Sequence, residues 1–198
     1  MKEMIKMVVV LTVLSAFSGS LLAAIHHKLS ERIDYQKLKF VQGPAIKEIL
    51  EGTSNDPLSD RFKLNINGAE KSFFVGVFDG NPNAVAFETF GKGYGGELGV
   101  MVGIDITNDK ILGVRVTTHS ETPGMGARAK TDLEFVEQFK GQPIAETFKV
   151  RSDGGQVDAL SGATFTSRGV SAALTEAGEL YQKLKPKIKE KLKSYKKM

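Results

Sequence analysis

A run of nineteen residues without a charged side chain, 7–25, places the strongest constraint on this 198-residue chain. A helix of that length can span the hydrocarbon core of a bilayer, so we predict a transmembrane anchor over residues 1–28. A cleaved signal peptide is the alternative, because small residues at 18–20 and 23–24 follow the apolar run. The run extends beyond the short apolar core of most signal peptides, which favours a retained anchor.

The charges beside the apolar run bear on its orientation. Lys2 and Lys6 favour a cytoplasmic N-terminus, whereas Lys28 and Arg32 on the other side weaken that bias. The charge pattern alone therefore leaves the orientation open.

Composition excludes several classes of protein. The formal net charge is +4, but residues 183–198 hold eight lysines and one glutamate, so the remainder is slightly acidic. Aromatic residues are not interleaved with basic ones, which argues against a nucleic-acid partner. The chain has no cysteine, which excludes disulfides and thiolate-bound iron–sulfur clusters. Three histidines, His26, His27 and His119, are too few for a histidine-rich metal site, so we predict no bound metal.

The remainder of the chain predicts one domain of the α+β class. Residues 29–57 form a helical stalk or linker, interrupted at Pro44. Residues 58–184 form a mainly antiparallel sheet with flanking helices, and residues 185–198 form a basic, solvated helical tail disturbed by Pro186. Apolar alternation predicts strands at 61–66, 72–78, 84–90, 98–107 and 111–118.

Shorter signals complete this outline. Asn67-Gly68, between two alternating runs, is a strong signal for a hairpin. Thr131-x-x-Glu134 predicts a capping box at the start of a helix that Gly141 ends. Residues 148–151 predict a short strand.

A glycine-rich segment, 91–96, has the formal spacing of a dinucleotide-binding loop. That motif requires a helix after the glycines, whereas here a predicted strand follows. The sequence therefore excludes a Rossmann fold, and the residues alone indicate a flexible glycine hairpin.

The segment 158–167, Asp-Ala-Leu-Ser-Gly-Ala-Thr-Phe-Thr-Ser, gathers four hydroxyl side chains before a predicted helix. Helix N-terminal amides favour anions such as phosphate. Read from physics alone, these hydroxyls are ordinary N-caps. Thr164 has no nearby histidine to act as a base, so if it carries a covalent group, another enzyme attached it.

Asp158-x-x-Ser161-Gly162-Ala163-Thr164 resembles the D-x-x-[ST]-G-A-T signature of the FMN-binding domain. That domain occurs in the G subunit of the Rnf electron-transport complex and in the C subunit of the sodium-translocating NADH:quinone reductase. The resemblance implies one FMN joined by a phosphoester to Thr164, attached by a flavin transferase. The motif register disfavours Thr166 as the attachment point. The phosphate would be held by the neighbouring residues Ser161, Gly162, Ala163, Thr166 and Ser167.

Two further loops resemble flavin-site loops of the same family. The Glu-Thr-Pro-Gly-Met-Gly-Ala segment, 121–127, implies that Glu121, Thr122 and Met125 approach the isoalloxazine ring. Tyr94, in the glycine segment, is expected near the flavin for the same reason. His119 is interpreted as a partly buried surface histidine instead of a ring neighbour.

The resemblance implies an electron-carrier subunit of a redox-driven ion translocase, with no substrate site of its own. Its position would be the cytoplasmic (inner) membrane, single-pass, with the N-terminus inside and the FMN domain outside. Its partners would be the other membrane subunits of an Rnf-type complex. Three alternatives remain: the C subunit of the quinone reductase, a secreted FMN-binding electron-transfer protein, and an anchored structural module in which the hydroxyl segment only caps a helix.

Overall fold

The computed structural model describes residues 1–66 and 68–195 and divides the chain into two units, 1–40 and 41–198. The first unit contains the helix α1 (Lys2–Lys37). Its stretch Lys2–Ser30 is long and apolar enough to cross a membrane, and none of its apolar window is buried. The apolar run therefore forms one continuous helix, as the sequence predicted.

A short helix that contains a proline lies at the start of the second unit. A π-helical turn, Leu38–Gln42, precedes α2 (Gly43–Ile49), and Pro44 lies in the first turn of α2. Proline is tolerated there because the first amides of a helix have no partner within the helix. Pro44 thus lies at the start of a new helix segment.

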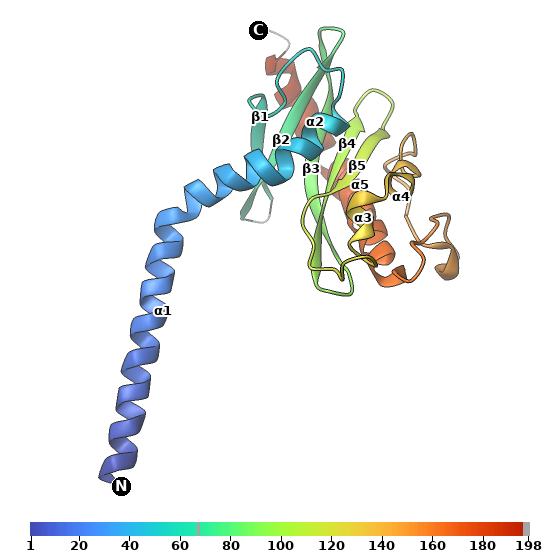
Figure 1. The fold of residues 1–198 in the computed structure, drawn as a ribbon. Coiled ribbons are helices and arrows are strands. Elements are labelled where there is room, and N and C mark those ends of the chain that lie inside the picture. Colours follow the sequence, from blue (N-terminus) through green and yellow to red (C-terminus); the bar gives the residue numbers. More distant parts are fainter. Residues whose placement is uncertain (67, 196–198) are drawn as a thin grey trace. The chain divides into compact units, whose positions relative to one another are not determined.

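One antiparallel sheet forms the centre of the second unit, with its strands in chain order (Figure 1). The strands are β1 (Arg61–Ile66), β2 (Ala69–Phe78), β3 (Asn81–Lys92), β4 (Glu97–Asp105) and β5 (Lys110–Val116). All five predicted strands are confirmed. Asn67 lies outside the described residues, but Ile66 pairs with Ala69, so the predicted hairpin joins β1 and β2.

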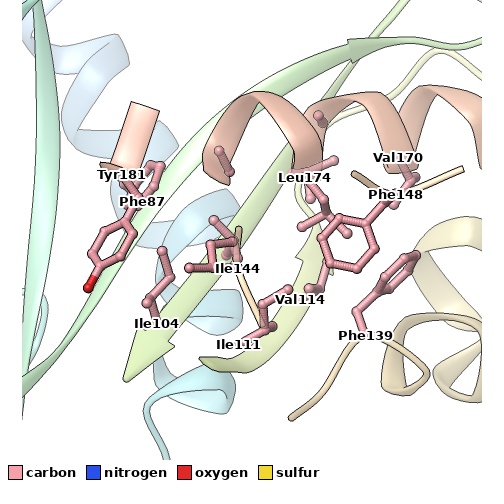
Figure 2. Packing of buried hydrophobic residues seen from close by; sticks show 14 of the residues in the cluster. Phe87, Ile104, Ile111, Val114, Phe139, Ile144, Phe148, Val170, Leu174 and Tyr181 are labelled. Atoms are coloured by element: carbon pink, nitrogen blue, oxygen red, sulfur yellow. The ribbon is translucent and has the colours of Figure 1, made fainter. Parts of the chain in front are cut away.

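The two faces of the sheet are covered by different helices: α2 lies in front of it and α5 (Thr164–Tyr195) behind it in Figure 1. Alternate residues of each strand point to opposite faces. The face toward α5 carries the main hydrophobic core, which is continuous from the sheet to α5 and to the loops after β5 (Figure 2). Its largest fully buried side chains include Phe73, Phe87, Phe139, Leu174 and Tyr181. The predicted α+β class is confirmed.

Three glycines make a shallow trough on the face toward α2. A Cβ at Gly103 of β4 would collide with Cγ2 of Ile49, and one at Gly113 of β5 would lie 3.5 Å from Cγ1 of Ile49. A Cβ at Gly76 of β2 would lie 3.2 Å from Leu50. Ile49 and Leu50 are buried there, so the end of α2 packs directly onto the backbone of the sheet.

The segment between β5 and α5 differs from two predictions. It holds α3 (Arg128–Thr131) and α4 (Leu133–Glu137), and the N-cap of α4 is Asp132, whose carboxylate accepts a hydrogen bond from the Phe135 amide. The predicted capping box on Thr131 is wrong, because Thr131 belongs to the preceding helix. The predicted strand at 148–151 is also wrong: Val150 forms a single parallel bridge to Val157, and a 3₁₀ turn, Arg151–Asp153, follows.

Helix α5 continues through Pro186 to Tyr195, in contrast to the solvated tail that was predicted from residue 185. Ile188 and Leu192 extend its apolar stripe and are buried in the core. Pro186 is on the exposed side. The Tyr195 hydroxyl donates a hydrogen bond to the carbonyl of Arg61, which ties the end of the helix to β1.

Asp109 joins the turn between β4 and β5 to the middle of α5. Its carboxylate accepts hydrogen bonds from the Tyr181 hydroxyl and the Lys185 ammonium, each at 2.6 Å. Burial raises the pKa of Asp109, but these two donors outweigh burial and leave that pKa below its ordinary value. The contact fixes the register of α5 on the sheet.

Candidate functional site

Three segments that are far apart in the sequence meet at the N-terminal end of α5. The Thr166 hydroxyl of α5 donates to Oε2 of Glu121 at 2.5 Å, and the Gly95 amide donates to Oε1 of the same carboxylate at 2.8 Å. The structure therefore brings together the glycine segment, the loop at 121–127 and the hydroxyl segment that the sequence singled out.

Glu121 lies at the centre of this junction and is only 7% exposed. A Cβ at Gly93 or at Gly126 would collide with its carboxylate, and one at Gly126 would also lie 2.6 Å from Oγ1 of Thr166. Both glycines are therefore required for the loops to approach the carboxylate so closely.

The turn before α5 is fixed by side chains of two other residues. The Gln138 amide accepts a hydrogen bond from the Asp158 N–H at 2.8 Å and donates one to the Asp158 carbonyl at 3.2 Å. The Ser167 hydroxyl accepts from the Leu160 N–H at 2.9 Å and donates to the Ala163 carbonyl at 3.1 Å. The backbone of this turn is thus held from both ends.

Asp158 itself braces the turn from the surface. Its carboxylate lies 2.5 Å from Nε of Arg151, and both side chains are largely exposed. An exposed pair of this kind contributes little to stability.

The first turn of α5 leaves backbone donors available. Thr164 is its first residue and is half-buried, whereas Ser161 and Gly162 are exposed. Within the described residues, no acceptor pairs with the N–H groups of Thr164, Phe165 and Thr166. Such amides, at the positive end of a 32-residue helix, suit an anionic oxygen.

The predicted phosphate-binding residues divide into two groups. Thr166 and Ser167 are buried, with their hydroxyls already bonded to protein groups, and the Ala163 N–H donates to the Leu160 carbonyl. Ser161 and Gly162 face solvent. In the structure the buried hydroxyls shape the turn, and the exposed positions are the ones accessible to a ligand.

Three large side chains are exposed around Thr164: Tyr94 at 78%, Phe165 at 61% and Met125 at 50%. The rings of Tyr94 and Phe165 are 6.4 Å apart, and the Met125 methyl would lie 3.5 Å from a Cβ at Gly162. Large apolar side chains that gather in the open indicate a binding surface. A flat ring system of a ligand is suited to such a surface.

Thr122, a predicted flavin neighbour, and His119, which was interpreted as a partly buried surface histidine, take part in the loop itself. The Thr122 side chain is exposed, and its carbonyl accepts from the Met125 and Ala127 amides. His119 is half-buried, and its Nδ1 accepts the Glu121 N–H at 3.3 Å.

Sequence reasoning missed three residues of this region. Phe165 lies inside the motif, where its apolar side chain beside small residues was a usable signal. Arg168 lies 5.3 Å above the Phe165 ring and pairs with Asp153 at 2.6 Å. Gln138 belongs to no motif, so nothing in the sequence marked it.

Comparisons with known proteins show the family of this chain. The FMN-binding domain family matches residues 93–179, which include the loop at 121–127, the hydroxyl segment and residues 93–96 of the glycine segment. The G subunit of the ion-translocating oxidoreductase complex of Vibrio cholerae is 35% identical over 182 residues, 86% of this chain and 86% of that protein. The corresponding protein of Methanosarcina acetivorans is 33% identical over 178 residues, 89% of this chain and 93% of that protein.

Solved structures of related proteins share the fold. The C subunit of the Na⁺-translocating NADH-quinone reductase of Parabacteroides distasonis superimposes with a TM-score of 0.57 at 25% identity, covering 76% of this chain and 95% of that chain. The corresponding protein of Shewanella oneidensis gives a TM-score of 0.53 at 24% identity, covering 70% and 72%, which supports the fold alone. With its FMN-binding domain and with relatives that match it over most of its length, this chain belongs to the family of the G subunit of the ion-translocating oxidoreductase (Rnf) complex.

Proposed function

We propose that this protein is the membrane-anchored electron carrier of an Rnf-type complex and that it holds one FMN by a phosphoester to Thr164. The observation that carries the proposal is the position of Thr164. It is the first residue of α5, its neighbouring amides have no acceptor among the described residues, and two loops of the FMN-binding domain converge beside it.

The residues at the site fit the parts of FMN. The open amides of the first turn of α5, with the exposed Ser161 and Gly162, suit the phosphate. The exposed side chains of Tyr94, Phe165 and Met125 suit the faces and edges of the isoalloxazine. Glu121 and Thr166 hold the loops at the spacing that this arrangement needs, and Ser167 fixes the turn.

Attachment requires a separate flavin transferase acting on FAD. The Thr164 oxygen forms a bond to the FMN phosphorus, the bond between the two phosphates of FAD breaks, AMP leaves, and the hydroxyl proton passes to a base of the transferase. No histidine other than His119 lies in the domain at 41–198, and His119 already accepts the Glu121 N–H, so the chain offers no free histidine as a base for this step.

When bound, FMN supplies reversible electron transfer, while the protein sets the position of the ring and its surroundings. The amides at the start of α5 stabilise the phosphate charge, and the covalent bond prevents loss of the cofactor to the surrounding solution. The chain needs no independent substrate site for this role, because its partners are the redox centres of neighbouring subunits.

The relatives' names support the assembly, and α1 supports the attachment to a membrane. The relatives at 33–35% identity are G subunits of ion-translocating oxidoreductase complexes, whereas the quinone-reductase protein is similar at 25%. We therefore favour an Rnf-type complex. The proposed topology is single-pass, with Lys2 and Lys6 on the cytoplasmic side and the FMN domain outside.

The test is the intact mass of the protein purified from its native membrane, compared with Thr164→Ala and Thr166→Ala variants. The native protein is expected to gain the mass of one FMN less one water. Thr164→Ala is expected to lose that gain in mass. Thr166→Ala keeps the Thr164 hydroxyl and should still show the gain, in part or in full. Loss only in Thr166→Ala would move the bond to Thr166, and no gain in cells that make the transferase would refute the covalent flavin.

A further inference from the structure

The far end of α5 carries a concentration of positive charge. Between Lys183 and Lys193 there are six lysines, one glutamate and no arginine, whereas residues 41–182 hold 13 basic and 19 acidic side chains. The end of α5 remote from Thr164 is therefore net positive, whereas the rest of the domain is net negative.

These lysines are presented by a packed helix. Leu184, Ile188 and Leu192 are buried in the core, and the Tyr195 hydroxyl is bonded to the Arg61 carbonyl. Lys185 is occupied by Asp109 at 2.6 Å. The remaining five lysines are exposed and border the buried stripe on both sides; we call them the lysine surface: Lys183, Lys187, Lys189, Lys191 and Lys193.

The composition of the lysine surface favours a lipid partner over a protein partner. Protein interfaces are enriched in aromatic residues, methionine and arginine and depleted in lysine. Among the described residues, no large exposed hydrophobic side chain lies in α5 beyond Phe165. A surface of lysines without exposed apolar side chains suits the phosphate groups of lipids, because it can bind them without inserting a side chain into the bilayer.

The apolar helix α1 adds the second argument. If α1 remains in the bilayer, the short segment after Ser30 keeps the domain close to the lipid headgroups. Binding of the domain to the headgroups is then intramolecular in effect. A weak electrostatic attraction then suffices to orient the domain, and five lysines near an anionic surface supply one.

We propose that the lysine surface binds anionic phospholipid headgroups and so orients the FMN domain on its membrane. This inference rests on the membrane attachment given under the proposed function and does not depend on the flavin. Thr164 and Lys189 are 25 residues apart on one helix, about 37 Å at the usual rise. Contact through the lysine surface, with α5 directed away from the membrane, would place the Thr164 end away from the headgroups, available to a neighbouring subunit.

The experiment uses the full chain in lipid nanodiscs. Because the chain has no cysteine, Ser194→Cys supplies a single site for a donor dye, and the acceptor is carried on lipid headgroups. Energy transfer is expected to be higher on phosphatidylglycerol-containing discs than on phosphatidylcholine discs. The difference should fall as salt rises from about 0.05 M to about 0.5 M, because screening weakens exposed charges. A donor placed instead by Glu134→Cys, near the Thr164 end, is expected to show lower transfer.

Two matched triple variants separate the lysine surface from net charge. Lys183→Gln, Lys187→Gln and Lys191→Gln together are expected to abolish the dependence on anionic lipid. Lys47→Gln, Lys140→Gln and Lys149→Gln, at exposed positions elsewhere in the domain, change the net charge equally and are expected to retain it. Glutamine is a good helix former, so the helix should persist, which circular dichroism checks.

Equal transfer on both kinds of disc, or transfer that ignores salt, would overturn the proposal. So would an unaltered lipid response in the first triple variant. Loss of co-purifying complex subunits in that variant, without any lipid dependence, would assign the lysine surface to an acidic protein partner instead. Failure to find FMN on the protein leaves this readout unchanged, so the two proposals fail separately.

Discussion

The two ends of α5 are built differently. At the N-terminal end, the buried hydroxyls of Thr166 and Ser167 are bonded to Glu121 and to the turn before the helix. At the C-terminal end, Ile188 and Leu192 are buried in the core, and the polar groups lie outside. One helix therefore serves two purposes. Directional hydrogen bonds set the shape of the site at one end, and apolar burial holds the helix at the other.

Ile188→Ala is expected to have the largest effect on stability. Truncating a fully buried isoleucine removes apolar contact and leaves a cavity, at a cost of about 2–5 kcal/mol in the free energy of unfolding. Urea denaturation measures it, with the exposed Lys187→Ala as the control. Folded protein should retain its covalent flavin. Loss of flavin from the folded variant would show that the two ends are not independent.

Pro186→Ala is expected to stabilise the C-terminal end. Proline within α5 removes one helical hydrogen bond, so alanine should raise the free energy of unfolding by about 1–3 kcal/mol. The control is Glu190→Ala, one turn further along α5, because this substitution adds no backbone N–H. A destabilised Pro186→Ala protein would mean that the helix has adapted to the proline in a way that alanine disrupts.

Thr166→Val tests the N-terminal end. It keeps the side-chain shape but leaves a buried carboxylate oxygen of Glu121 without its donor, which costs about 1–3 kcal/mol. We expect incomplete covalent flavin by intact mass as well, because the loops lose their common attachment. Thr166→Ser keeps the hydroxyl and should behave like the native protein. Full flavin loading in Thr166→Val would remove Glu121 and Thr166 from the proposed positioning role.

Tyr181→Phe is expected to have the smallest effect, about 1 kcal/mol, since it removes a single hydrogen bond to the half-exposed Asp109. The pKa of Asp109 is lowered in the folded protein, so its contribution to stability is present above its ordinary pKa and is lost as the pH falls through the lowered value. The loss of stability from about pH 5 into the acid range should therefore be shallower in Tyr181→Phe. Urea titrations at several pH values measure this, and an unchanged acid slope would contradict it.

The sequence predicted those features that depend on local pattern. Alternating apolar residues located all five strands, and the small and hydroxyl residues at 161–167 located the start of α5. Predictions that relied on a single proline or a single helix-capping residue were less successful. Pro186 suggested a solvated helical tail, but the apolar stripe through Ile188 and Leu192 packs the helix on the sheet. Similarly, Asp132 displaced Thr131 as the cap because Thr131 completes the preceding turn.

Contacts between distant residues were beyond such patterns. Nothing local indicates that the Gln138 amide pairs with the Asp158 backbone, or that Glu121 is buried and bonded to Thr166. Both depend on how the loops meet in space. The site residues that directly contact the flavin stay predictions, which the mass measurement and the Thr166 variants address.

The trough of Gly76, Gly103 and Gly113 has a mechanical consequence. Because Ile49 and Leu50 fill it, α2 packs directly on the backbone of the sheet, and a force applied through the chain from the N-terminal side is expected to reach the sheet at this contact. Any reorientation of the domain on its tether is then expected at backbone angles before Gly43. The π-helical turn Leu38–Gln42, in which no residue is buried, lies at that point. Filling the trough with a methyl group at Gly103 would weaken this coupling without touching the site at Thr164.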